Sequence, residues 1–340
     1  MMSGTDDFLE EEGAADMHCC ASCGIAEVDD VELKKCGDCD LVRYCSDKCQ
    51  QDHRPEHEEK CKERAAELRD EILFRQPEGT HLGDCPICCL PLNPMPTEFT
   101  LMACCSKFVC IGCEIANGVR EWQSKISHAC PFCRQPVPTD SEAEVNNMER
   151  AAANDPVAIR EMGASHFHKE DWNAAMEFYS RAAALGDADA NYKIGSHYCE
   201  GTYVEKDEEK GLYHLEEAAI AGHPDARYEL AHYELFQYDD IGIRADRAVK
   251  HLIIAAKLGN DKAIQTLRHC YTTEFISKEV YAASLRAYQA AVVAMKSPNR
   301  ETAAASKLYA KQHSSEEIMG ELLKKFSRQE AQQLLPFPIP

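Results

Sequence analysis

Cysteines near the start of the chain are the side chains best suited to chemistry. Seventeen of the 19 cysteines lie between Cys19 and Cys133, and several form C-x2-C pairs, a spacing typical of zinc ligands. The first 17 residues contain six acids and no Lys or Arg, so they do not fit a secretion signal. We therefore expect a reducing compartment, cytoplasmic or nuclear, in which thiolates bind metal rather than form disulfides.

The first cysteine cluster offers eight ligands in four pairs. The pairs are Cys20 with Cys23, Cys36 with Cys39, Cys45 with Cys49, and His57 with Cys61. Because a structural zinc takes four ligands, eight ligands make two closed sites. His57 and Cys61 are four residues apart and share one face of a helix expected over 56–75. His53 is an alternative to His57.

The segment LKKCGDCDLVRYCSDKCQ resembles the MYND zinc finger. The resemblance implies interleaved ligand sets: Cys20, Cys23, Cys45 and Cys49 for one zinc, and Cys36, Cys39, His57 and Cys61 for the other. MYND fingers bind peptides, and Ser46 and Gln50 match family positions around the third pair. Arg54 stands where the family usually has Trp, which argues against proline-rich ligands.

The second cysteine cluster, from CPIC at Cys85 to ACPFC ending at Cys133, resembles an all-cysteine RING finger. The resemblance implies one zinc on Cys85, Cys88, Cys110 and Cys113, and another on Cys104, Cys105, Cys130 and Cys133. Cys104 and Cys105 are adjacent, and side chains of successive extended residues point in opposite directions. The alternative keeps one of them and recruits His128.

A RING finger has no catalytic residue of its own. The resemblance implies that it positions a ubiquitin-conjugating enzyme, which is catalysis by orientation. The residues that match the family's docking surface are Ile87, Pro131 and Arg134.

The second half of the chain contains a helical repeat. Gly186, Gly222 and Gly259 follow similar alanine-rich segments at spacings of 36 and 37 residues. Two-helix repeats of this period bury their apolar faces only by stacking into a solenoid. The pattern resembles Sel-like repeats, which bind partner proteins or peptides. After these repeats, Ser314 with Glu317 forms a capping-box pattern that predicts a C-terminal helix.

These elements define a mostly α protein: two small zinc-stabilised α+β fingers followed by an α-solenoid. The expected parts are an acidic disordered tail (1–17), a MYND-type finger plus helix (18–75), a linker (76–84), a RING-type finger (85–136), a linker (137–156), Sel-like repeats (157–298), and a C-terminal helix with an extended tail (299–340). The net charge of −21 argues against nucleic-acid binding, and no apolar stretch is long enough to span a membrane.

The sequence leads to two functional hypotheses. The first is a RING-type ubiquitin-protein ligase in which the repeats recruit substrate and the second finger recruits a ubiquitin-conjugating enzyme. The second is a non-catalytic scaffold that uses the MYND finger and the repeats. Both require four structural zinc ions, because such short fingers cannot bury enough apolar surface to fold alone.

Overall fold

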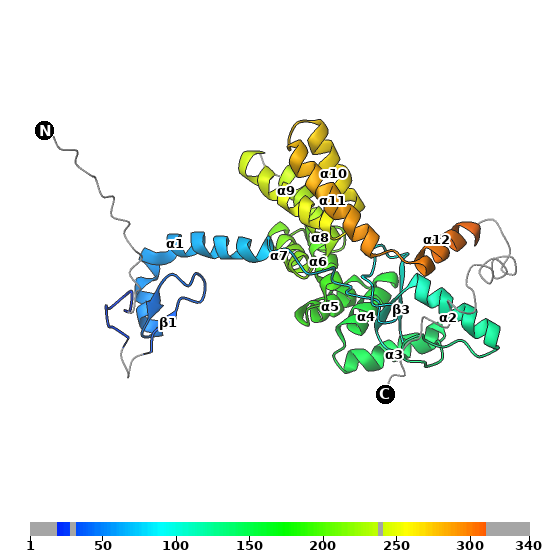
Figure 1. The fold of residues 1–340 in the computed structure, drawn as a ribbon. Helices are drawn as coiled ribbons and strands as arrows, with labels where there is room; N and C mark the ends of the chain where they lie inside the picture. The colour runs from blue at the N-terminus through cyan, green and yellow to red at the C-terminus, as the bar shows by residue number, and fades with distance from the viewer. Residues whose placement is uncertain (1–18, 28–31, 237–240, 311–340) are drawn as a thin grey trace. The chain divides into compact units, whose positions relative to one another are not determined.

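The computed structural model describes residues 19–27, 32–236 and 241–310. The expected acidic tail and the helix predicted after Ser314 lie outside these ranges. The described residues form two compact units, one ending at Leu73 and the other beginning at Phe74. As predicted, the fold is mostly α, with small strand-containing finger regions (Figure 1).

The first unit contains a short hairpin and a long helix. Strand β1 (Lys34–Lys35) pairs antiparallel with β2 (Arg43–Tyr44), and α1 covers Asp47–Leu73. The helix begins well before the expected start at residue 56 and continues through Pro55. The small core of the first unit contains Leu33 and Tyr44 packed among buried cysteines, so the ligand residues supply much of its buried surface.

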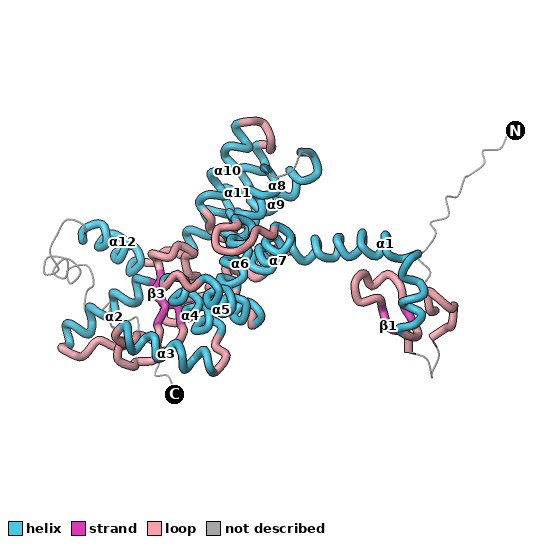
Figure 2. Tube along the Cα trace, turned by 180° about the vertical axis from the view of Figure 1, so that it is seen from behind, coloured by secondary structure: helices cyan, strands magenta, loops and turns pink. Residues whose placement is uncertain are grey.

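The second unit begins with another small finger. Strands β3 (Phe99–Met102) and β4 (Lys107–Cys110) form an antiparallel hairpin, and α2 (Ile111–Ser124) follows at once. Leu92 and Val109 are fully buried beside the cysteines. The hairpin and α2 therefore pack around the ligand residues. The tube view in Figure 2 shows α2 next to β3.

The segment 137–156, expected to be a linker, contains a helix. Thr139 and Glu142 form a capping box that starts α3 (Asp140–Ala152). Ala151 is buried in the same core cluster as Ala158 and Ile159 of the next helix. This packing extends the repeat array by one helix at its N-terminal end.

The repeat array consists of helices that pack mainly on their neighbours in the chain. They are α4 (Pro156–His168), α5 (Trp172–Ala184), α6 (Ala188–Glu200), α7 (Glu208–Ile220), α8 (Pro224–Phe236), α9 (Ile241–Lys257), α10 (Asp261–Thr272) and α11 (Lys278–Ala294). The repeat glycines Gly186, Gly222 and Gly259 have φ values of 87°, 88° and 86°, a conformation that favours glycine. Each one therefore lets the chain turn into the next helix.

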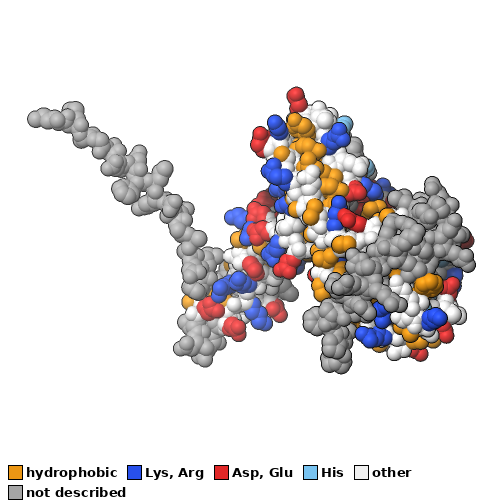
Figure 3. Space-filling view, turned by 45° about the vertical axis from the view of Figure 1, so that its right-hand side comes forward, with side chains coloured by type: hydrophobic (Ala, Val, Ile, Leu, Met, Phe, Trp, Pro, Cys, Tyr) orange, Lys and Arg blue, Asp and Glu red, His pale blue; other side chains and the backbone are white. Residues whose placement is uncertain are grey.

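Apolar side chains are also exposed on the array. Figure 3 shows a run of apolar side chains, coloured orange, over the C-terminal end of the array, with acidic and basic side chains on either side. Exposed apolar residues in this part of the array include Tyr271, Phe275 and Val293. The final described helix, α12 (Pro298–Ala310), leaves the array and packs on α2. Within the described residues, no helix has the length and apolar character needed to cross a membrane.

Candidate metal centres and a peptide groove

The first finger, residues 19–61, brings its eight predicted ligands into two groups. Cys20, Cys23, Cys45 and Cys49 form one group, in which the Sγ atoms of Cys23 and Cys45 are 3.6 Å apart and those of Cys45 and Cys49 are also 3.6 Å apart. Cys45 lies two residues before the first residue of α1, and Cys49 lies in the first turn of this helix. The start of this helix therefore supplies half of the group.

The second group contains Cys36 and Cys39 from the β1–β2 turn and His57 and Cys61 from α1. Cys39 Sγ lies 3.2 Å from His57 Nε2, and the Cys36 and Cys61 Sγ atoms are 3.7 Å apart. Burial lowers the pKa of His57, which favours the neutral imidazole that a metal requires. His53 lies outside the group: its Nδ1 is 3.0 Å from the Tyr44 hydroxyl.

The second finger, residues 84–136, also has two interleaved groups. Cys85 and Cys88 meet Cys110 at the end of β4 and Cys113 at the start of α2, with 3.9 Å between the Cys88 and Cys110 Sγ atoms. The Cys110 amide N–H donates to Cys85 Sγ at 3.4 Å. Strand and helix thus hold one ligand pair, while a turn holds the other.

The other group of the second finger contains both adjacent cysteines with the last C-x2-C pair. Cys104 Sγ is 3.3 Å from Cys133 Sγ, and Cys105 Sγ is 3.9 Å from Cys130 Sγ. His128 is 56% exposed, and its Nδ1 lies 2.7 Å from a Glu121 carboxylate oxygen. The geometry therefore favours the two-cysteine set over the His128 alternative.

Cys110 and Cys113 lie where β4 meets α2, but the other four C-x2-C pairs form turns of one backbone design. In each, the residue after the second cysteine has a positive φ, and its N–H bonds to the carbonyl of the first cysteine. Gly24, Asp40, Cys89 and Arg134 have φ values of 72°, 57°, 53° and 62°. This turn leaves neighbouring amides free to point at the sulfurs. Burial would raise the pKa of Cys20, but bonds from the Cys23, Cys45 and Ser22 amides outweigh it and lower the pKa to about 6.

These donor sets fit zinc. With Zn–S bonds of about 2.3 Å, a tetrahedral site separates its sulfurs by roughly 3.8 Å. The Sγ–Sγ distances of 3.3 to 3.9 Å match this value and are far too long for a disulfide, about 2.05 Å. Each group would hold one ion as a closed, structural site.

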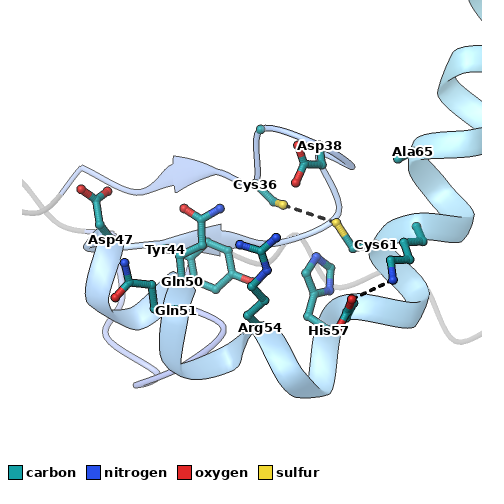
Figure 4. A pocket seen from close by; sticks show the side chains of 13 residues that line it. Cys36, Asp38, Tyr44, Asp47, Gln50, Gln51, Arg54, His57, Cys61 and Ala65 are labelled. Atoms are coloured by element: carbon teal, nitrogen blue, oxygen red, sulfur yellow. Dashed lines mark hydrogen bonds and ion pairs between the residues drawn. The ribbon is translucent and has the colours of Figure 1, made fainter. Parts of the chain in front are cut away.

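A groove of about 700 Å³ lies beside His57 and Cys61 in the first finger (Figure 4). Gln50, one of the two residues predicted to bind peptide, lines it. Ser46, the other, instead accepts the Cys49 N–H at 3.3 Å and helps begin α1. Arg54 and Asp47 also line the groove, so its wall carries charge where the family usually places an aromatic ring.

The predicted docking residues of the second finger have different exposures. Ile87 is half-buried against the finger core, Pro131 is buried and Arg134 is exposed. Trp122 is 56% exposed on α2. Only part of this set is accessible to a partner.

Sequence reasoning did not identify a cluster of His81, Asp189 and His223. Both histidine Nε2 atoms approach Asp189 Oδ1, at 3.1 and 3.3 Å, and the two imidazole rings stack 4.3 Å apart. His223 Nδ1 accepts the Ala226 N–H, so Nε2 carries the proton and donates to Asp189. This tautomer favours a hydrogen-bonded cluster over a metal site.

The repeat pattern contained a signal for this cluster. Asp187 and Asn260, at the same repeat position as His223, also accept the N–H three residues further on. His223 is therefore an unusual helix cap, with a second ring nitrogen available to bind Asp189.

Comparison with known families agrees with two of the predicted modules. The MYND finger family matches residues 20–61, and the Sel1 repeat family matches residues 161–187, 188–223 and 224–260. The MYND and Sel1 predictions are confirmed. Both are protein–protein interaction modules, and the MYND finger implies bound zinc. No curated protein matches the chain.

Solved structures with related repeats are also found. A Sel1 repeat protein from Oxalobacter formigenes is 28% identical over 37% of this chain and 96% of its own, with a TM-score of 0.34. A protective antigen of uropathogenic Escherichia coli with an SLR fold is 17% identical over 64% of this chain and 47% of its own, with a TM-score of 0.40.

Proposed function

We propose that this protein is a non-catalytic adaptor, held together by four structural zinc ions, whose first finger binds a basic peptide. The four donor sets support the ion count, and their reduced cysteines suit an intracellular compartment, cytoplasmic or nuclear. The repeat array supplies a second surface for partner proteins.

The observation that carries the peptide proposal is the charge of the groove. Glu58 is paired with Lys62 at 2.7 Å, whereas neither Asp38 nor Asp47 has an ion-pair partner in the described part of the chain. Two carboxylates thus outweigh the one guanidinium of Arg54. Zinc bound by three thiolates and one imidazole adds a further net negative charge. Gln50 and Gln51 provide amides that can hydrogen-bond an extended peptide backbone.

Fluorescence polarisation with labelled basic, acidic and proline-rich peptides tests this proposal. We expect the basic peptides to bind most tightly and to weaken as salt screens the groove. Exposed ion pairs contribute up to about 1 kcal/mol, so Asp38→Asn or Asp47→Asn would weaken binding by up to about fivefold. Glu59→Gln, on an exposed residue outside the groove, is the matched control. Equal binding of all three peptide classes would contradict the proposal.

A ubiquitin ligase is the second candidate function. The interleaved ligand groups of the second finger, with a hairpin and a helix between them, favour it. The burial of Pro131 and the packing of α12 on α2 disfavour it, because a docking enzyme must reach this face.

Discharge of ubiquitin from a panel of loaded conjugating enzymes distinguishes the two functions. A ligase would accelerate discharge and lose this effect on Ile87→Ala or Arg134→Ala. An adaptor would leave discharge at its uncatalysed rate with every enzyme.

A further inference from the structure

Helix α12 makes an unusually close contact with the second finger. A Cβ atom added to Gly112, in the first turn of α2, would lie 2.7 Å from the backbone nitrogen of Arg300. Figures 1 and 2 show α12 beside α2, although almost 190 residues separate them. Gly112 thus allows the start of α12 to touch the start of α2.

The side chain of Arg300 enters the loop that contains the first ligand pair of this finger. Its Nη1 donates to the Pro91 carbonyl at 2.6 Å, and its Nη2 donates to the Leu90 carbonyl at 3.1 Å and to Cys88 Sγ at 3.4 Å. A further bond joins Nη1 to the Met295 carbonyl at 2.7 Å. Arg300 is only 8% exposed, so these are not loose surface contacts.

The charge of the metal site explains why a cation would belong there. Zinc with four thiolates carries a net charge of −2, and buried charge is costly unless it is paired. Arg300 donates a hydrogen bond to Cys88 Sγ, which brings its positive charge to this site. Its planar guanidinium can reach a sulfur and two carbonyls together, which a lysine ammonium cannot do with the same geometry.

We propose that Arg300 is a positioning residue of the zinc site formed by Cys85, Cys88, Cys110 and Cys113. It holds the 85–92 loop closed around the ion and offsets the charge of the thiolates. This role rests on the proposal that the site binds zinc. This contact makes the stability of the second finger depend on α12, a helix that follows the repeats in the chain.

Site-resolved thiol protection tests this role in the full-length zinc-loaded protein. Chelator and N-ethylmaleimide are added together, and mass spectrometry of the peptides measures the labelling rate of each cysteine. The variants are Arg300→Gln, Arg300→Lys and Gly112→Ala. The Gly112→Ala substitution keeps Arg300 but displaces α12 from α2. Arg286→Gln, on an exposed arginine of α11, is the matched control.

Loss of a residue that supports a metal ligand typically weakens a site by 10- to 100-fold. We expect Arg300→Gln to label Cys85, Cys88, Cys110 and Cys113 at least about tenfold faster, while cysteines of the first finger keep their rates. Arg300→Lys should give a smaller increase, and Gly112→Ala should act like Arg300→Gln.

Hydrogen exchange of α12 separates this role from simple anchoring. If Arg300→Gln speeds hydrogen exchange in α12 but does not speed labelling of the four cysteines, then Arg300 only anchors the helix. That result would overturn the proposal. Immediate labelling of the four cysteines in the unmutated protein without chelator would instead refute zinc binding itself, and with it the role of Arg300.

Discussion

Cys104 and Cys105 are adjacent in the chain, yet both Sγ atoms face the pair formed by Cys130 and Cys133. An extended backbone would point them apart. The chain instead turns sharply: the N–H groups of Cys105 and Ser106 both bond to the Met102 carbonyl, and Ser106 has a φ of 51°. This turn between β3 and β4 lets two neighbouring cysteines belong to one four-cysteine group.

Substitution of Cys105 should therefore cost one zinc ion, whereas substitution of His128 should cost none. Cys105→Ser leaves three good ligands in its group, while His128→Ala removes only the hydrogen bond to Glu121. Zinc content per chain, measured by elemental analysis, checks both variants. The His128 alternative would be supported if the two variants gave the opposite pattern.

The two histidines in the N-terminal half of α1, His53 and His57, should behave differently as well. His57→Ala should remove one zinc ion, because Nε2 of His57 faces Cys39 Sγ. His53→Ala should retain the ion, although it loses the bond to Tyr44 and the stacking of its ring on His57. Cobalt substitution provides the measurement, since a site with three sulfurs and one nitrogen absorbs differently from one with four sulfurs. If His53→Ala lost the absorption of the site with three sulfurs and one nitrogen, His57 would not be the histidine ligand.

Gly195→Ala should destabilise the repeat array. The added Cβ would lie 2.7 Å from Leu215 Cγ and 2.9 Å from the Gly211 carbonyl oxygen, where α6 crosses α7. Overpacking of this kind costs about 1–3 kcal/mol, which denaturant unfolding followed by circular dichroism would detect.

Gly118→Ala in α2 is the control for this substitution. Apart from the backbone of α2 itself, the added Cβ would meet no atom within 4 Å, so Gly118→Ala should stabilise the protein by about 0.5–1 kcal/mol through helix propensity. Equal effects of the two variants would mean that the crossing is not tightly packed.

The array should also lose stability as the pH falls from 7.5 to 5.5. Burial lowers the pKa of His223, which the folded protein therefore keeps neutral, while the unfolded chain takes up a proton below about pH 6.5. Stability is thus full above pH 6.5 and falls below it by at most about 1.4 kcal/mol per pH unit for each such histidine. His251, for which burial also lowers the pKa, acts in the same direction.

His223→Asn should make this pH dependence shallower. Asparagine preserves the helix cap, as Asn260 does in the next repeat, and does not titrate. Urea unfolding at several pH values measures the slope, with His168→Asn on an exposed histidine as the control. An unchanged slope in His223→Asn would refute the assignment. Asp189 adds a further loss of stability near pH 4 and below. In the folded protein, hydrogen bonds from His223 and His81 outweigh burial and hold the pKa of Asp189 well below the usual range, so the unfolded chain takes up a proton at Asp189 first.

Local patterns predicted the modules well and their connections poorly. Ligand spacing identified the first finger, and the period between Gly186, Gly222 and Gly259 identified the array, because both patterns repeat over short distances. The contact between Arg300 and Cys88 joins residues 212 positions apart and has no local signature. The helix over 140–152 was missed because its polar face resembles a linker, although Thr139 and Glu142 carried a capping signal.

Native mass spectrometry of the full-length chain, purified without chelator, tests the central claim most directly. The account predicts a mass excess of four zinc ions, with loss of finger structure when a chelator removes them. Two or fewer bound ions per chain, or cysteines paired as disulfides, would contradict it.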